Sequence, residues 1–301
     1  MKSDFVSKRI LITGIEGFTG KHLSRILEQK GAEVWGTSLH SSRERVLCCD
    51  ICDRACVEEV VAKVNPHYVF HLAGKAFTAS RNSEAFYSVN VFGTENLLTA
   101  LRKYGQALQK ILVTSSATVY GPQNSFILDE TMCPAPVQHY GYSKYIMEKI
   151  CTTLFNELPL VVVRPFNYTG PGQDECFVVP KIVGHFRRRA SVIELGNLDV
   201  YREFNDVRYV IECYLRLMAS DVSATIVNVA SQKPVALSEI LEILTRLTDH
   251  HIEVRTNPSF VRKNEIHSLC GSVDKLATLI SLPKTFSLEE TLKWMLTAND
   301  S

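Results

Sequence analysis

A glycine-rich segment near the start of the chain most strongly limits the fold. The apolar, β-branched run Arg9–Thr13 leads directly into Gly14-Ile15-Glu16-Gly17-Phe18-Thr19-Gly20, and residues 20–30 then carry apolar side chains three and four apart. A strand, a glycine turn and a helix in this order are typical of a dinucleotide-binding unit, in which a pyrophosphate lies against the turn and the helix N-terminus. We therefore predict that the cofactor is bound by Gly14, Gly17, Phe18, Thr19 and Gly20.

The alternation of later segments predicts a doubly wound α/β fold. Short apolar runs occur at 34–39, 46–49, 68–72, 111–114 and 160–163, and helical periodicity fills the stretches between them, notably over 84–104 and 139–154. Continuous apolar strands that alternate with helices form a parallel sheet with helices on both faces. We predict a Rossmann domain over residues 1–165 and a smaller, mixed α/β substrate lobe over residues 166–301, with a return of the chain to the sheet near 203–230.

Charge and hydropathy exclude several classes of function. Lys and Arg number 33 and Asp and Glu number 32, so the formal net charge of +1 gives no excess with which to hold a nucleic acid. No apolar run approaches the roughly 18 to 20 residues of a membrane-spanning helix. Residues 1–4 carry an acid and precede no long apolar stretch, so we expect no signal peptide. We expect a cytoplasmic protein that binds neither nucleic acid nor membrane.

The nine cysteines are scattered and odd in number, which indicates free thiols. Cys49, Cys52 and Cys56 offer the composition of a partial zinc site. Because Cys49 ends an apolar run, Cys56 begins a helical stretch and no paired Cys or His spacing follows, we interpret these residues as structural thiols and expect no metal site.

A tyrosine and a lysine four residues apart give the chain a catalytic signature. In Tyr140-Gly141-Tyr142-Ser143-Lys144, positions 140 and 144 share one face of a helix. A phenol has a pKa near 10, and a nearby ammonium group together with an oxidised nicotinamide lowers it, so that Tyr140 can exchange a proton with a substrate oxygen. Ser116, just beyond a strand end, is placed to hydrogen-bond the same oxygen. We predict that Ser116, Tyr140 and Lys144 are catalytic.

The choice between the two nicotinamide cofactors depends on the residues after the second strand. No acid is present there to bind the adenosine ribose, whereas Ser38, His40 and Arg43 offer donors for a 2′-phosphate. The sequence therefore favours NADP(H), with NAD(H) as the alternative. After the third strand, Asp50 is placed to accept from the adenine amino group and Asp53 to cap the next helix.

Taken together, the motifs resemble the extended short-chain dehydrogenase/reductases, the NAD-dependent epimerase/dehydratase family. They are the glycine segment, His71-Leu72-Ala73-Gly74, Ser115-Ser116-Ala117-Thr118-Val119-Tyr120-Gly121 and Tyr140-x-x-x-Lys144. Within that superfamily, Arg164-Pro165-Phe166-Asn167-Tyr168-Thr169-Gly170-Pro171-Gly172-Gln173 is most similar to the GDP-4-keto-6-deoxy-mannose reductases. The stretches 195–198 and 202–207 add to this similarity.

The resemblance implies further contacts. On the cofactor it implies Ile51, Leu72, Ala73, Gly74, Ser115, Pro165 and Asn167. On the substrate it implies Ser80, Ser116, Asn167, Lys181, Leu195, Asn197, Arg202, Arg262 and Glu265. Arg202 and Arg262 would pair with phosphates, a charge-assisted and bidentate interaction, and Glu265 with the nucleoside. The resemblance also implies a homodimer that pairs the helices near 84–104 and 139–154.

The reaction that the resemblance implies is the NAD(P)H-dependent reduction of a 4-keto-6-deoxy sugar nucleotide. The similar dehydratases carry acids directly after the hydroxyl that corresponds to Ser116, where this chain has Ala117 and Thr118, so dehydration is disfavoured. The same stretch is also similar to sugar 4-epimerases, which leaves an NAD-dependent 4-epimerase as an alternative. A non-catalytic nucleotide-sensing protein is a further alternative, which the presence of Ser116, Tyr140 and Lys144 disfavours.

Overall fold

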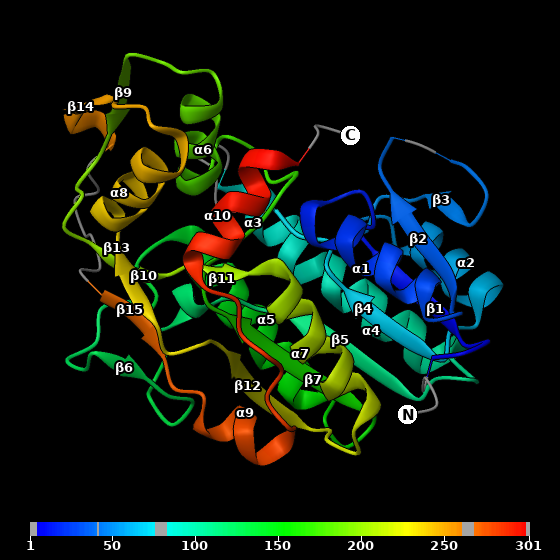
Figure 1. The fold of residues 1–301 in the computed structure, drawn as a ribbon. Coiled ribbons are helices and arrows are strands. Elements are labelled where there is room, and N and C mark those ends of the chain that lie inside the picture. The colour runs from blue at the N-terminus through cyan, green and yellow to red at the C-terminus, as the bar shows by residue number, and fades with distance from the viewer. Residues whose placement is uncertain (1–4, 41, 76–82, 261–267, 299–301) are drawn as a thin grey trace.

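A parallel sheet of seven strands forms the centre of the molecule (Figure 1). The computed structural model describes residues 5–40, 42–75, 83–260 and 268–298. The strands are β1 (Arg9–Thr13), β2 (Glu33–Ser38), β3 (Val46–Cys48), β4 (Tyr68–His71), β5 (Lys110–Thr114), β7 (Leu160–Pro165) and β12 (Thr225–Val229). They lie in the order β12-β7-β5-β4-β1-β2-β3, and all six neighbouring pairs are parallel. The predicted doubly wound fold is confirmed.

Helices cover both faces of this sheet. One face carries α1 (Phe18–Gln29), α7 (Val207–Ala219) and α9 (Asp274–Leu279), and the other carries α2 (Arg54–Val64), α4 (Thr94–Tyr104) and α5 (His139–Thr153). The side chains at helical spacing are the ones that become buried, such as Leu23 and Leu27 in α1. Because the strands are apolar on both faces, each helix layer closes a separate hydrophobic core over the sheet.

The helical segment predicted over 84–104 changes its pitch in the middle. It consists of α3 (Glu84–Tyr87), a π-helical segment over Ser88–Gly93, and α4. The Asn90 carbonyl, inside the π-helical segment, accepts from Thr94 Oγ1 at 2.7 Å. Such π-helical turns often occur at functional sites, and this one brings the fully buried Asn90 toward the carboxyl edge of the sheet.

Beyond β7 the chain alternates between the large sheet and a smaller lobe. The remaining elements are β8 (Tyr168–Thr169), α6 (Val178–Arg187), β9 (Val192–Leu195), β10 (Tyr201–Glu203), β11 (Asn205–Asp206), β13 (Pro234–Ala236), α8 (Leu237–Thr248), β14 (Glu253–Thr256), β15 (Ser268–Gly271) and α10 (Leu288–Thr297). The chain returns to the sheet through α7 and β12, and β12 pairs with β7. Conversely, β6 (Ile127–Leu128), from the first half of the sequence, joins the small sheet β13-β10-β15-β6.

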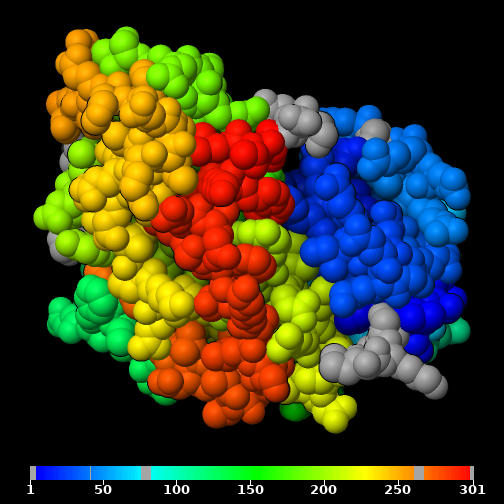
Figure 2. Space-filling view, viewed as in Figure 1, coloured from blue at the N-terminus to red at the C-terminus, as the bar shows by residue number. Residues whose placement is uncertain are grey.

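The smaller lobe has its own core, formed by α6, α8 and α10 around Ile182, Ile240 and Leu292. Its last helix also packs on the large domain, and Figure 2 shows α10 (red) lying against the blue start of the chain. Trp294 of α10 makes an edge contact with His22 of α1, with ring centroids 5.7 Å apart. The end of the chain therefore supports the helix that follows the glycine segment.

Two of the predicted strands end one residue early at the edge of the sheet. β2 ends at Ser38 rather than at residue 39, and β3 ends at Cys48 rather than at residue 49. Because β3 is the edge strand and is paired on one side only, its last residue, Cys48, is exposed.

Candidate active site

The site lies where the connections of the sheet change direction, between β1 and β4. The chain leaves β1 toward β2 on one side and leaves β4 toward β5 on the other, which opens a crevice at the carboxyl ends of these two strands. Thr13 Oγ1, at the end of β1, accepts from the Ala73 N–H at 3.2 Å and hydrogen-bonds His71 Nδ1 at 2.7 Å. The two strand ends are thereby tied together beneath the glycine segment.

The glycine segment fits a dinucleotide. Gly14 has a φ of +72°, and a Cβ there would lie 2.9 Å from the Ala73 backbone. A Cβ on Gly20 would lie 2.5 Å from the Gly14 carbonyl oxygen. Gly17 is the N-cap of α1 and has no side chain with which to cap the first turn. The backbone N–H groups and the positive end of the helix dipole are therefore left to a phosphate ligand.

His71 is a neutral imidazole held between two hydroxyl groups. Its Nε2 lies 2.8 Å from Thr94 Oγ1, whose own hydrogen goes to the Asn90 carbonyl, so Nε2 is the protonated nitrogen. Burial lowers the pKa of His71 to about 3, and the positive charge of Lys144 adds to this effect.

The three predicted catalytic residues meet at the same edge of the sheet. Lys144 Nζ donates to the Thr114 carbonyl at the end of β5 at 2.7 Å, and a Cβ on Gly74 would lie 3.3 Å from it. Ser116 Oγ accepts from Thr118 Oγ1 at 2.9 Å and hydrogen-bonds the Tyr140 phenol. The Tyr140 ring packs edge-on against another aromatic ring, that of Phe86.

Burial determines the protonation of this group in the protein alone. It raises the pKa of Tyr140 to about 12, although the Ser116 hydrogen bond opposes the shift. It lowers the pKa of Lys144 to about 8, against the opposing effects of Cys151 and Glu148. At neutral pH the site therefore holds a neutral phenol, which can donate a proton, beside an ammonium group.

A buried carboxylate that the sequence did not single out holds these elements in place. Glu148 lies one turn beyond Lys144 on α5 and accepts from Arg164 Nε at 2.9 Å and Nη2 at 2.7 Å. It also accepts from Ser115 Oγ at 2.6 Å. Because Arg164 belongs to β7 and Ser115 follows β5, this carboxylate joins α5 to the ends of two strands.

Asn90 is a second polar residue that sequence reasoning missed. Its Nδ2 donates to Ser143 Oγ at 3.0 Å, and its Oδ1 accepts from the Lys75 N–H at 2.8 Å. It thus connects α5 to the segment after β4. The sequence feature that could have indicated Asn90 is a single amide side chain inside an apolar helical stretch, Val89-Asn90-Val91.

The residues expected around the adenosine lie at the end of β2 and β3. Ser38 Oγ donates to the Glu16 carboxylate and accepts from the His40 N–H at 3.2 Å. The side chains of His40, Arg43 and Asp50 are exposed, and Ile51 is buried. Asp53 caps α2, because its carboxylate accepts from the N–H groups of residues 55 and 56, which confirms that prediction.

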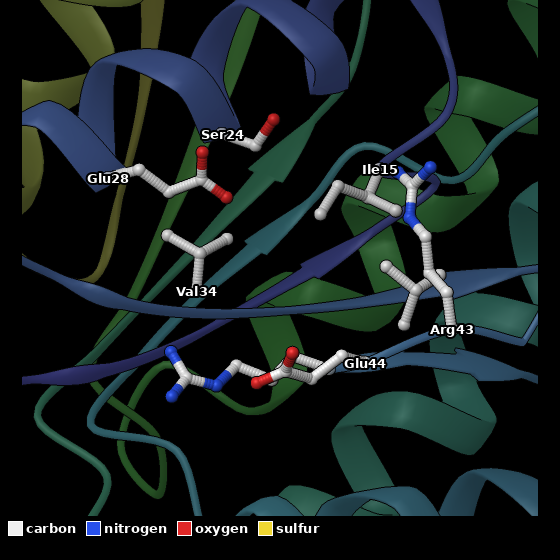
Figure 3. Close-up of a pocket in the computed structure, with 8 residues that line it drawn as sticks. Ile15, Ser24, Glu28, Val34, Arg43 and Glu44 are labelled. Carbon is white, nitrogen blue, oxygen red and sulfur yellow. The ribbon is translucent and has the colours of Figure 1, made fainter.

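Arg43 also lines a pocket of about 300 Å³ on the α1 side of the sheet edge (Figure 3). Ser24 and Glu28 of α1, Val34 of β2 and Ile15 of the glycine segment contribute to its wall. None of the three catalytic candidates lines this pocket.

The residues expected around the substrate fall mainly on the smaller lobe. Lys181 Nζ of α6 donates to the Glu194 carbonyl at 2.7 Å, and Arg202 Nη1 of β10 donates to the Tyr201 carbonyl at 2.8 Å. Leu195 is buried at the end of β9, Asn197 Oδ1 accepts from the N–H of residue 199, and Asn167 is exposed just after β7, which ends at the buried Pro165. Ser80, Arg262 and Glu265 lie outside the described residues.

Within the described ranges, no cluster of three or more His, Cys, Asp or Glu residues is arranged to hold a metal ion. In the same part of the chain, no helix combines the length and the apolar character needed to cross a membrane.

Comparison with known proteins places these features in context. Residues 10–230 match the model of the NAD dependent epimerase/dehydratase family. A GDP-6-deoxy-D-talose 4-dehydrogenase from Aggregatibacter actinomycetemcomitans is 34% identical over 95% of this chain and 97% of its own. A GDP-6-deoxy-D-mannose reductase from Pseudomonas aeruginosa is 28% identical over 97% of each chain. The solved structure of RMD from Pseudomonas aeruginosa, complexed with NADPH, superposes with a TM-score of 0.85 at 27% identity, covering 97% of each chain.

Removing one charge of the buried ion pair should destabilise the fold. We expect Glu148→Gln to leave the Arg164 guanidinium buried without a counter-charge, at a cost of roughly 3–5 kcal/mol in the free energy of unfolding. Urea denaturation measures the loss. Glu157→Gln is the control, because Glu157 pairs with Arg102 at 3.0 Å on the surface, where such a pair contributes about 1 kcal/mol or less. Equal losses in the two variants would contradict the role given to Glu148.

The neutral His71 should make the fold sensitive to mild acid. Since its pKa is about 3 when folded and about 6.5 when unfolded, the unfolded chain binds the extra proton between these pH values. The contribution of neutral His71 to the free energy of unfolding is then fully present above pH 6.5. It falls as the pH falls, by about 2 kcal/mol at pH 5. In His71→Gln the difference in unfolding free energy between pH 7.5 and pH 5 should shrink by that amount. An unchanged difference in urea denaturation would show that His71 does not titrate in this way.

Proposed function

This chain belongs to the NAD dependent epimerase/dehydratase family, and from that premise we propose that it reduces a 4-keto-6-deoxy sugar nucleotide, of the GDP-4-keto-6-deoxy-mannose type, with a reduced nicotinamide cofactor. The family and its relatives support an NAD(P)-dependent sugar-nucleotide oxidoreductase. The observation that carries the proposal is the meeting of Ser116, Tyr140 and Lys144 at the crevice, with Tyr140 held as a neutral phenol.

Reduction of a carbonyl requires a hydride at carbon and a proton at oxygen. A nicotinamide cofactor bound in the crevice would supply the hydride for C4 of the sugar. The Tyr140 phenol donates its proton to the sugar O4, and the Ser116 hydroxyl hydrogen-bonds the same oxygen and so orients the carbonyl. Tyr140 is left as a phenolate and takes up a proton from solvent before the next turnover.

Lys144 assists Tyr140 by its charge. Its ammonium group is one helical turn away on the same face of α5, and an ammonium close to a phenol favours the phenolate that forms when the proton leaves. Its hydrogen bond to the Thr114 carbonyl at 2.7 Å keeps the ammonium at the end of β5. The same group is placed to hydrogen-bond the ribose next to the nicotinamide.

The names of two relatives support the class of sugar nucleotide that we propose as the substrate. One is a 4-dehydrogenase of GDP-6-deoxy-D-talose and the other a GDP-6-deoxy-D-mannose reductase, and these two sugars differ only in configuration at C4. The first name states an oxidation at position 4 of a GDP-linked 6-deoxyhexose, and the second names a reductase for a sugar of the same class. The product formed depends on which face of the C4 carbonyl is turned toward the hydride, so product analysis identifies it.

An NAD-dependent 4-epimerase remains the second candidate, because Ser116-Ala117-Thr118-Val119-Tyr120-Gly121 is also similar to the epimerases. The two activities differ in their use of the cofactor. A reductase consumes reduced cofactor in proportion to product, whereas an epimerase returns the hydride to the sugar and shows no net consumption.

The proposed reductase activity, with Tyr140 as the proton donor, can be tested directly. We expect the purified protein to oxidise NADH or NADPH in the presence of GDP-4-keto-6-deoxymannose, followed by absorbance of the reduced cofactor. Tyr140→Phe should lower kcat/KM about 10²- to 10⁴-fold, the range of general acid catalysis. Tyr142→Phe, on the exposed face of the same helix, should have no such effect. No oxidation with this substrate or its dTDP analogue would reject the reductase.

We also propose that the protein is a homodimer. Phe92 of the π-helical segment and Tyr142 and Ile146 of α5 are 58%, 45% and 42% exposed, and their two elements pack side by side. Such neighbouring apolar side chains form a face that a second copy can cover. Pairing of these helices with their copies would bury all three.

Charge on this face should separate the subunits. We expect light scattering to give a dimer for the wild type and a monomer for Ile146→Glu, because burying the carboxylate at the interface is costly. Leu282→Glu, at a residue 41% exposed in the loop between α9 and α10, is the control and should remain dimeric. A monomeric wild type at micromolar concentration would contradict the proposal.

A further inference from the structure

We propose that Cys49 and Cys56 are a modification site, at which a hydroperoxide converts the two thiols into a reversible disulfide. The site goes beyond the proposed function, because neither thiol belongs to the residues assigned to catalysis. It also refines the interpretation of the cysteines as structural thiols, since both thiols are free only in the reduced protein.

The turn between β3 and α2 brings the two cysteines together. Cys49 directly follows β3, and Cys56 lies in the first turn of α2. Between them, the Asp53 N–H donates to the Asp50 carbonyl at 3.0 Å, and the Asp53 carboxylate accepts from the Cys56 N–H at 3.2 Å. These hydrogen bonds fold the start of α2 back onto the end of the edge strand.

Both sulfur atoms lie beside the same short piece of backbone. Cys56 Sγ donates to the Cys48 carbonyl at 3.6 Å, and Cys49 Sγ donates to the Asp50 carbonyl at 3.6 Å. These two carbonyl groups flank Cys49, and the side chains of Cys49 and Cys56 interact directly. A disulfide requires Cβ atoms roughly 3.5–4.5 Å apart. The reduced fold therefore already holds the two thiols as neighbours.

The two thiols differ in their access to solvent. Cys49 is buried in the core between the sheet and α2, whereas Cys56 is half-buried at the margin of this core. Burial and the contact with Cys56 raise the pKa of Cys49, and the nearby acids Asp53 and Asp50 add to the shift. Cys49 therefore stays protonated at neutral pH, and Cys56 is the thiol that a small peroxide meets first.

The chemistry balances with the peroxide as the only oxidant. The Cys56 thiolate attacks one peroxide oxygen, the O–O bond breaks, and a sulfenic acid forms on Cys56. Cys49 Sγ then attacks the Cys56 sulfur, the S–O bond breaks, and the departing hydroxide takes the Cys49 proton and leaves as water. The two thiols lose two electrons and two protons in total, and hydrogen peroxide is reduced to two molecules of water.

A third cysteine nearby makes the pairing a specific claim. Cys52 is closer in sequence to both thiols and is exposed. Burial of its sulfur and the neighbouring Asp50 carboxylate raise the pKa of Cys52 to about 11, which keeps it protonated. Exposure or spacing alone would favour a bond to Cys52, whereas the contact in the structure favours Cys49 with Cys56.

The disulfide should also stabilise the edge of the sheet. It would close the segment 49–56 into a covalent loop, which restricts the unfolded chain, and it would join β3 to α2. Because β3 is paired with β2 alone, this edge has few other attachments. A bond that forms between preplaced thiols adds this stabilisation without straining the native fold.

Peptide mapping of the wild type tests the pairing without any variant. The reduced, full-length protein is treated with a small excess of hydrogen peroxide, alkylated under denaturing conditions and cleaved with trypsin. Trypsin separates residues 46–54, which hold three cysteines, from residues 55–63, which hold Cys56. We expect these two peptides to be joined through Cys49, at least tenfold in excess of any disulfide within residues 46–54. Dithiothreitol should separate them.

Variants and unfolding add two further readouts. Cys56→Ser should abolish the bond, and the matched control Cys52→Ser should retain it. In Cys49→Ser, the sulfenic acid on Cys56 has lost its partner and should be trapped by dimedone on residues 55–63. The midpoint of urea denaturation should be higher for the oxidised wild type than for the reduced protein, and peroxide should not raise it in Cys56→Ser.

Two results would overturn the inference. One is a wild type in which peroxide joins no peptides or forms a bond within residues 46–54. The other is a protein that carries the Cys49–Cys56 bond but unfolds at the same or a lower urea concentration than the reduced form, because the thiols were then forced together. Reduction of the sugar nucleotide does not use these thiols, so either result leaves the proposed function standing.

Discussion

The buried ion pair between Glu148 and Arg164 is the contact on which the arrangement of the site depends. Two charges removed from water are tolerated only when each is paired and hydrogen-bonded. Glu148 meets this condition with two bonds from Arg164 and one from Ser115. The contact therefore has one good geometry, and that geometry sets α5 against the ends of β5 and β7. Tyr140 and Lys144 lie on the same helix, so the positions of the proton donor and the ammonium follow from it.

A second set of buried hydrogen bonds joins the elements beneath the crevice. Thr13, His71 and Thr94 form a chain of hydrogen bonds from β1 through β4 to α4, with His71 neutral at its centre. A neutral imidazole suits this place, because a second cation beside the buried Lys144 would be unfavourable. The chain of hydrogen bonds ties the ends of β1 and β4 together beneath the glycine segment.

The fold by itself does not decide the reaction, because doubly wound sheets carry many chemistries. The decision falls to a few side chains at the carboxyl edge. Ala117 and Thr118 take the places in which similar dehydratases carry acids, and the neutral Tyr140 suits donation of a proton to a carbonyl oxygen.

By itself, the sequence determined local features of the structure. The strand, turn and helix over residues 9–29, the shared face of Tyr140 and Lys144 and the cap by Asp53 all follow from spacings within one or two turns of chain, and these agree with the structure. Only the tertiary structure could decide which distant residues meet. Glu148 with Arg164, His71 with Thr13 and Glu16 with Ser38 each join different elements, 16, 58 and 22 residues apart. Periodicity predicts which face of an element is buried, but it does not predict which polar side chain of another element contacts that face. For that reason the contact between the glycine segment and the end of β2 follows from the pairing of β1 with β2, and neither segment predicts it alone.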